Sequence, residues 1–140
     1  MRVWLLDTGP LVAVLNRRDP QHQRCVAALA AFSGTLVTTG AVVTEAMHFV
    51  GGQPGGSEAL AGLLDDAQVD IRDCFAPGEL HAAGKLMKKY ADCPMDFADA
   101  TLVMLAEETG FDHILTLDGR GFRTYRFRGT KRFALVLAEG

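Results

Sequence analysis

The segment at residues 95–110, MDFADATLVMLAEETG, places two carboxylates, Asp96 and Asp99, at the start of an apolar helical pattern. Residues three positions apart lie on one face of a helix, so we expect the two side chains to be neighbours. Negative charge is favoured in a first helical turn because the helix dipole is positive there, and capping therefore explains one of them. Capping does not require a second acid on the same face, so a second interpretation is that this face contacts a metal ion or other carboxylates.

Three further acids occur where the chain could bring them to the same place. Asp7 and Asp118 each end a short apolar run that predicts a buried strand, and Glu45 lies in the early turns of a helical segment. Ligands of parallel α/β sheets bind beyond the carboxyl ends of the strands. We therefore expect one edge of the fold to gather the acids Asp7, Glu45, Asp96 or Asp99, and Asp118.

Carboxylates that converge on one cleft repel one another, and this repulsion raises their affinity for protons unless a cation is present. Mg²⁺ or Mn²⁺ removes the penalty, because both ions take oxygen ligands. Such an ion also supplies an activated water and stabilises the charge that develops when a phosphodiester is hydrolysed. The acids therefore predict metal-dependent cleavage of a nucleic-acid backbone.

Strand-like and helical segments alternate along the chain. We expect strands at 2–6, 33–39 after an opening turn, 69–75, 112–118 and 131–137, and helices at 11–16, 19–32, 40–50, 57–67, 77–90 and 95–110. This alternation predicts an α/β three-layer sandwich with a mostly parallel central sheet of about five strands flanked by helices. The length of 140 residues fits a single domain spanning 1–140.

The composition is that of a globular protein, with 49% hydrophobic and 22% charged residues. The apolar run at the start is interrupted by Asp7, so it is too short for a signal peptide or a membrane span. The three cysteines are scattered and form no C-x-x-C pair, which argues against a disulfide framework or a zinc site. We expect a soluble cytoplasmic protein with reduced thiols and no membrane partner.

The formal net charge of −3 conceals a basic segment at 119–133. This segment contains six Arg or Lys residues and no acid, interleaved with Phe122, Tyr125 and Phe127. Clustered cations are typical of a surface that contacts nucleic-acid phosphates. The candidate nucleic-acid-binding residues are Arg120, Arg123 and Arg126.

Four motifs together resemble a known family. They are LLDTGPLVA, VTEAMHFV, MDFADATLVMLAEETG and ILTLDGRGF, which occur in this order, are followed by a short basic tail and span nearly the whole chain. Their order and spacing are similar to those of the PIN-domain ribonucleases, and within that family to the VapC-type toxins of bacterial toxin–antitoxin pairs.

The resemblance implies an endoribonuclease toxin with an RNA substrate, a cognate antitoxin and a homodimeric assembly. It implies that one or two Mg²⁺ or Mn²⁺ ions are surrounded by the catalytic acids Asp7, Glu45, Asp99 and Asp118. Asp96 would be an accessory acid beside Asp99. Thr116, one pleat before Asp118, would hydrogen-bond to these acids, and Thr8 could do likewise.

Two other functions fit the same residues. Metal-assisted phosphodiester chemistry does not itself select the sugar, so a structure-specific or single-strand DNA nuclease is one alternative. A noncatalytic metal-binding or phosphoacceptor module is the other, because strand-end aspartates suit it too. A phosphoacceptor of the haloacid-dehalogenase kind would need a second aspartate two positions after Asp7, where this chain has Gly9.

Overall fold

A computed structural model describes residues 2–137, so Met1 and residues 138–140 of the predicted domain lie outside the described residues. Its main sheet has the strand order β3-β2-β1-β4-β7, and all of its pairings are parallel. The strands are β1 (Val3–Leu6), β2 (Thr35–Thr39), β3 (Asp70–Arg72), β4 (His113–Leu115) and β7 (Ala134–Leu135). The predicted fold class is confirmed.

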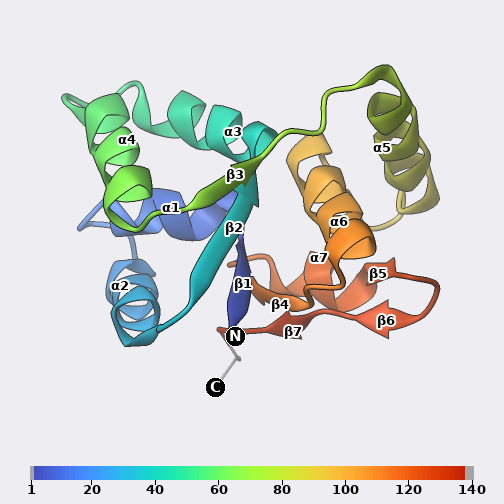
Figure 1. Ribbon diagram of the computed structural model, residues 1–140. Coiled ribbons are helices and arrows are strands. Elements are labelled where there is room, and N and C mark those ends of the chain that lie inside the picture. The colour runs from blue at the N-terminus through green and yellow to red at the C-terminus, as the bar shows by residue number, and fades with distance from the viewer. Residues whose placement is uncertain (1, 138–140) are drawn as a thin grey trace.

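Helices cover both faces of this sheet (Figure 1). One side carries α1 (Thr8–Val14), α2 (His22–Ala31), α3 (Gly40–Val50) and α4 (Gly56–Asp66); the other carries α5 (Pro77–Lys89), α6 (Phe97–Thr109) and α7 (Gly119–Thr124). The chain steps from β1 to β2 to β3 in one direction and returns past β1 to β4 and β7. Right-handed crossovers in opposite directions place their helices on opposite faces.

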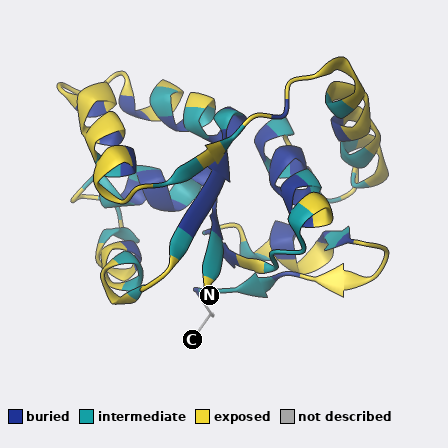
Figure 2. Cartoon of the chain, viewed as in Figure 1, coloured by how far each residue is buried: buried dark blue, intermediate teal, exposed yellow. Residues whose placement is uncertain are grey.

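The strands at the centre of the sheet are apolar on both faces because helices cover both. Leu5, Leu6, Ile114 and Leu115 are at most 1% exposed, as expected for a doubly covered parallel sheet. Helix α6 is also largely buried, whereas the outer faces of α4 and α5 meet solvent (Figure 2). The first turn of α6 is therefore held in place by the core beneath it.

Helix α1 begins at Thr8, three residues earlier than predicted, and Asp7 is its N-cap. Pro10 lies in the first turn, where its missing N–H removes no helical hydrogen bond. Because β1 ends at Leu6, strand and helix are separated by Asp7 alone. This tight connection keeps the Asp7 carboxylate at the carboxyl edge of the sheet.

The segment 131–137 supplies the fifth strand of the main sheet, as predicted, but that strand is shorter than the predicted range. Two short strands occur there: β6 (Lys131–Arg132) pairs antiparallel with β5 (Arg126–Phe127), and β7 joins the main sheet beside β4. Phe133 separates them because its ring is buried against Phe122 and Phe127, with ring centroids 5.3 and 5.0 Å away. Helix α7, which the sequence did not predict, supplies Phe122.

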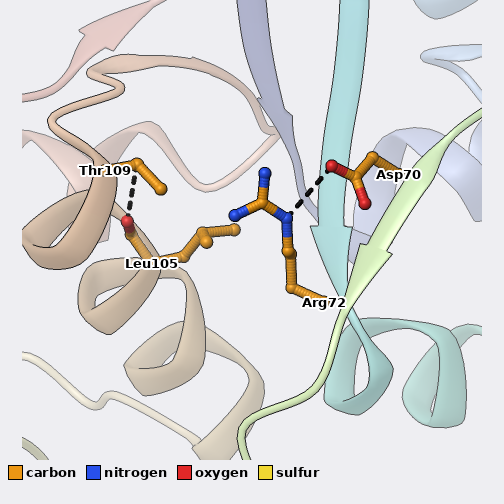
Figure 3. A network of polar contacts seen from close by, with 4 residues as sticks. All are labelled: Asp70, Arg72, Leu105 and Thr109. Carbon is orange, nitrogen blue, oxygen red and sulfur yellow. Dashed lines mark hydrogen bonds and ion pairs between the residues drawn. The ribbon is translucent and has the colours of Figure 1, made fainter.

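The edge strand β3 is attached mainly through its backbone pairing with β2. On its surface Arg72 Nε lies 3.0 Å from Asp70 Oδ2, with both side chains about two-fifths exposed. Figure 3 shows this pair next to α6, where the Thr109 hydroxyl donates to the Leu105 carbonyl at 2.7 Å. An exposed ion pair contributes at most about 1 kcal/mol, so it does not by itself hold β3.

Buried threonine hydroxyls connect the elements near the carboxyl edge. Thr38 Oγ1 of β2 donates to the carbonyl of Leu6 at 2.6 Å, at the residue before Asp7. Thr39 Oγ1, the N-cap of α3, lies 2.8 Å from Thr101 Oγ1 of α6. These bonds join three segments that are far apart in the sequence and define their spacing at this edge.

Replacing Thr38 with Val should lower the free energy of unfolding by about 1–3 kcal/mol, because the buried Leu6 carbonyl loses its hydroxyl donor while the side-chain volume is kept. Urea denaturation measures this change. The matched variant Thr44→Val removes a hydroxyl from an exposed site and should change stability by no more than about 0.5 kcal/mol. If both changes lower the free energy of unfolding equally, the hydrogen bond from Thr38 to Leu6 does not contribute more than an exposed one.

Candidate active site

A cleft of about 520 Å³ lies at the carboxyl edge of the sheet. All of the predicted acids line it, together with Thr8: Asp7, Glu45, Asp96, Asp99 and Asp118. Asp7 and Asp118 follow strands β1 and β4, Asp96 and Asp99 lie at the start of α6, and Glu45 lies in the second turn of α3. The fold therefore brings these side chains to one place, as the strand-end argument predicts.

Besides Asp7, the N-cap of α1, three other acids of the cleft take part in helix capping, which fixes their orientation. Asp118 Oδ1 accepts from the N–H of Gly121 at 3.0 Å at the start of α7. Asp96 Oδ1 accepts from the N–H of Asp99 at 2.8 Å, and Asp99 Oδ2 accepts from the N–H of Asp96 at 3.1 Å. Asp96 and Asp99 thus form a capping box and line the cleft at the same time.

Asp7 is the most buried acid of the cleft, with 6% of its surface exposed. Thr116 Oγ1 donates to Asp7 Oδ2 at 2.6 Å, as predicted, and the N–H of Thr8 donates to Oδ1 at 2.8 Å. Burial raises the pKa of Asp7 to about 6 although these hydrogen bonds favour the ionised form, and the charges of Asp96 and Asp118 raise it further. Ionising Asp7 is therefore costly in the metal-free protein.

Asp99 and Glu45 show the same effect. Burial, followed by the charges of Asp7 and Asp96, raises the pKa of Asp99 to about 8. The pKa of Glu45 is also raised, first by burial and then by Asp96 and Asp7, while the nearby Thr8 hydroxyl opposes the shift. The cleft therefore holds several carboxylates that repel one another and would gain from a bound cation.

The Thr8 hydroxyl lies in the wall of this cleft. It is buried and makes no well-formed hydrogen bond to any described residue, although it is near enough to Glu45 to lower the pKa of that acid. A buried polar atom without a partner is uncommon and is expected where a ligand or water completes the site. Thr8 is thus available to a group bound between Asp7 and Glu45.

The donor set suits a hydrated divalent cation. Within residues 2–137 no three His, Cys, Asp or Glu side chains form a ready-made metal site. Mg²⁺ does not require one, because it usually takes one or two carboxylates and keeps several waters. The raised pKa values of Asp7 and Asp99 and the unpartnered Thr8 hydroxyl fit such an ion.

Tyr125 lies between the segment before Asp96 and the first turn of α7, which Asp118 caps. Its buried hydroxyl donates to the carbonyl of Pro94 at 2.8 Å, just before the Asp96 cap. Burial raises the pKa of Tyr125, and the charges of Asp99 and Asp118 add to the shift. A Cβ at Gly121 would lie 2.3 Å from Asp118 Oδ2 and 3.0 Å from the Tyr125 hydroxyl oxygen, so only glycine permits this close packing.

The basic segment contributes cations but no exposed rings. Arg120 and Arg123 are exposed on α7, directly after Asp118. The Arg126 guanidinium lies at the end of α7, where Nη1 donates to three backbone carbonyls, those of Arg123, Thr124 and Tyr125. The interleaved aromatic residues are at most 1% exposed and belong to the core: Phe122, Tyr125 and Phe127.

The residues of the cleft that sequence reasoning missed include an acid, Asp19, and an aromatic residue, Phe49. Asp19 Oδ1 accepts from the N–H of Gln21 at 2.8 Å, so in the sequence Asp19 is indistinguishable from an ordinary turn-forming aspartate. Phe49 belongs to an apolar helical stretch that predicts core, yet 57% of its surface is exposed. No local pattern in the sequence predicts either position.

Comparisons with known proteins identify the family of this chain. The PIN domain model matches residues 4–128. The chain is 31% identical over 134 residues to Ribonuclease VapC26 of Mycobacterium tuberculosis, covering 94% of this chain and 98% of that protein. The chain therefore belongs to the PIN-domain family. Within it, the chain is a member of the VapC-type ribonucleases.

Two solved structures share the fold. One is the crystal structure of Mycobacterium tuberculosis VapC20, described as a sarcin–ricin loop cleaving toxin, with TM-score 0.74, 20% identity and coverage of 84% of this chain and 91% of that one. The other is VapBC2 from Rickettsia felis bound to a DNA fragment from its promoter, with TM-score 0.54, 18% identity and coverage of 82% and 87%. At these identities the likeness shows the fold.

The raised pKa values predict how stability depends on pH in the absence of metal. In the unfolded chain both aspartates ionise near the ordinary value of 3.8, whereas in the folded chain they do so near 6 for Asp7 and near 8 for Asp99. The folded state therefore binds more protons across this window, and the free energy of unfolding should fall as the pH rises through it. Urea denaturation in EDTA at several pH values measures the fall.

The variant Asp99→Asn provides the control for this pH dependence. It keeps the shape of the side chain and removes one titrating charge, so its stability should fall less steeply above the pKa of Asp7, near 6. If the free energy of unfolding depends on pH in the same way in wild type and variant, then ionisation of Asp99 does not destabilise the folded state.

Proposed function

We propose that this protein is a metal-dependent endoribonuclease that hydrolyses RNA phosphodiester bonds and acts as the toxin of a toxin–antitoxin pair. The observation that carries the proposal is the cleft that Asp7, Glu45, Asp99 and Asp118 line together. The pKa values of Asp7, Glu45 and Asp99 are raised there. Such a cleft is costly to fold without a cation. The named relative Ribonuclease VapC26 supports RNA as the substrate.

The four acids would hold Mg²⁺ or Mn²⁺, with Thr8 lining the same space. When bound, the cation activates water for attack on phosphorus and stabilises the charge that develops. Thr116 orients Asp7 by its 2.6 Å hydrogen bond, and Asp96 orients Asp99 through the capping box. Groups that orient ligands in this way commonly change activity by about 10–100-fold when removed.

Arg120 and Arg123 would contact phosphates on either side of the cleaved bond. Both are exposed and follow Asp118. Arg126 Nη1 is bonded to backbone carbonyls, so Arg126 would contribute positive charge from a fixed position. These cations offset the repulsion between an acidic cleft and a polyanion.

We further propose a cognate antitoxin partner and a homodimeric assembly in the cytoplasm. The solved structure of VapBC2 from Rickettsia felis, bound to a DNA fragment from its promoter, supports the first. An antitoxin Arg or Lys inserted among Asp7, Asp99 and Asp118 would compete with the cation for the same charge. Within the described residues no helix is long and apolar enough to cross a membrane.

Cleavage of a single-stranded RNA should require Mg²⁺ or Mn²⁺ and should stop in excess EDTA. Asp99→Asn and Asp118→Asn should lower the rate by more than about 100-fold, and Thr116→Val by about 10–100-fold. Asp66→Asn, at an exposed carboxylate outside the cleft, should cleave like wild type. Undiminished cleavage in EDTA would refute the proposal. Faster cleavage of a DNA of matched sequence would show that the substrate is DNA rather than RNA.

Changing Arg120 and Arg123 together to Ala should weaken RNA binding and flatten its salt dependence, by about 0.7 in the log–log slope for each lost contact with a single strand. Anisotropy titrations at several salt concentrations measure both quantities. Lys85→Ala, an exposed cation on α5, is the matched control. If the double variant keeps the wild-type slope, the RNA runs along another surface.

A further inference from the structure

A second hollow adjoins the acidic cleft. It has a volume of about 550 Å³ and lies against α3, the segment before α5 and the start of α6. Phe49, Phe75 and Phe97 line it, and Glu45, Phe49 and Asp96 belong to both hollows. The aromatic groove, as we call it, is therefore continuous with the cleft.

Two rings of the aromatic groove are exposed although they are large and apolar. Phe49 is 57% exposed and Phe75 is 46% exposed. The Phe75 ring is nevertheless held in place: a Cβ at Gly40 would lie 3.0 Å from its Cε2 atom, and the Phe97 ring centroid is 6.0 Å away at an interplanar angle of 33°. Because position 40 is glycine, the ring can lie directly on the first turn of α3. Phe75 thus presents a fixed aromatic face to solvent.

The charges around the aromatic groove indicate what could occupy it. The described residues that line it include one imidazole, His48, but no Lys or Arg, and the carboxylates of Glu45 and Asp96 lie at its border with the cleft. A phosphate would be repelled there, whereas a flat neutral group would not. Unpaired bases in single-stranded RNA are such groups, and proteins commonly bind them by stacking on aromatic side chains.

We propose that the aromatic groove binds one unpaired base of the RNA, next to the phosphate that enters the acidic cleft, by stacking on Phe75. Phe49, which lines both hollows, forms the boundary between the base and the cleaved bond. This inference rests on the proposed function and adds a requirement to it: the nucleotide beside the cleavage site must be unpaired. A double-stranded substrate keeps its bases stacked on one another and leaves the groove empty.

The test uses single-stranded RNA that carries 2-aminopurine at one position at a time, bound to the Asp99→Asn protein so that cleavage does not interfere. At one position beside the cleavage site the fluorescence should fall on binding, because stacking quenches this base. Phe75→Leu keeps an apolar side chain but removes the aromatic face, so it should abolish the quenching and weaken binding about ten-fold. Phe75→Trp should retain both.

An abasic nucleotide at that position separates stacking from other effects. With the abasic RNA, Phe75→Leu and the parent protein should bind equally, because the base that Phe75 would contact is missing. Leu80→Ala is the matched control: Leu80 is also 46% exposed but lies outside the groove, so this change should alter neither quenching nor affinity. Equal weakening of intact and abasic RNA by Phe75→Leu would overturn the proposal.

The other occupant to distinguish is a second copy of this chain, which would also cover exposed rings. Sedimentation equilibrium measures the oligomeric state of the Asp99→Asn protein with and without the Phe75→Leu change. A dimer that dissociates on the Phe75→Leu change, with no quenching at any position, would assign the groove to the dimer interface instead. Cleavage of RNA by the wild-type protein is measured separately, so a failure of the proposed nuclease activity is distinguished from a failure of base stacking.

Discussion

The burial of the Asp7 carboxylate is the constraint on which the rest of the site depends. Asp7 is the single residue between β1 and α1, so it cannot move toward solvent without separating a central strand from its helix. Thr116 and the Thr8 N–H satisfy both of its oxygens, yet its pKa remains well above the ordinary value. A cation that neutralises the cleft therefore also relieves a cost of folding, and this links metal binding to stability.

Capping and chemistry use the same atoms at this edge of the sheet. Asp96, Asp99 and Asp118 satisfy backbone N–H groups at the starts of α6 and α7 while their side chains line the cleft. The positive ends of the helix dipoles favour these negative charges and offset part of their mutual repulsion. For the segment MDFADA, capping and function are therefore both correct interpretations, because one geometry serves both.

The aromatic residues divide into two groups with different consequences. In the basic segment Phe122 and Phe127 pack against Phe133, and Tyr125 packs against Phe122; these contacts fix α7, which holds Asp118 in place. Phe49 and Phe75 remain at the surface beside the cleft, where apolar exposure costs stability and is retained where it contacts a ligand or partner. The sequence suggested the opposite assignment, since the rings interleaved with arginine resemble a nucleic-acid surface.

The sequence by itself determined the parallel α/β fold and the acids at strand ends and helix starts, because both follow from local periods in the sequence. The family resemblance implied that Thr116 bonds to one of the acids, and the tertiary structure selected Asp7, which is 109 residues away along the chain. It did not predict the division of 131–137 at Phe133, the cleft position of Asp19, or the exposure of Phe49 and Phe75. Those features depend on which distant segments pack together. Tertiary structure alone decided them, since a ring or a turn aspartate has the same local pattern whether it faces the core, the solvent or a cleft.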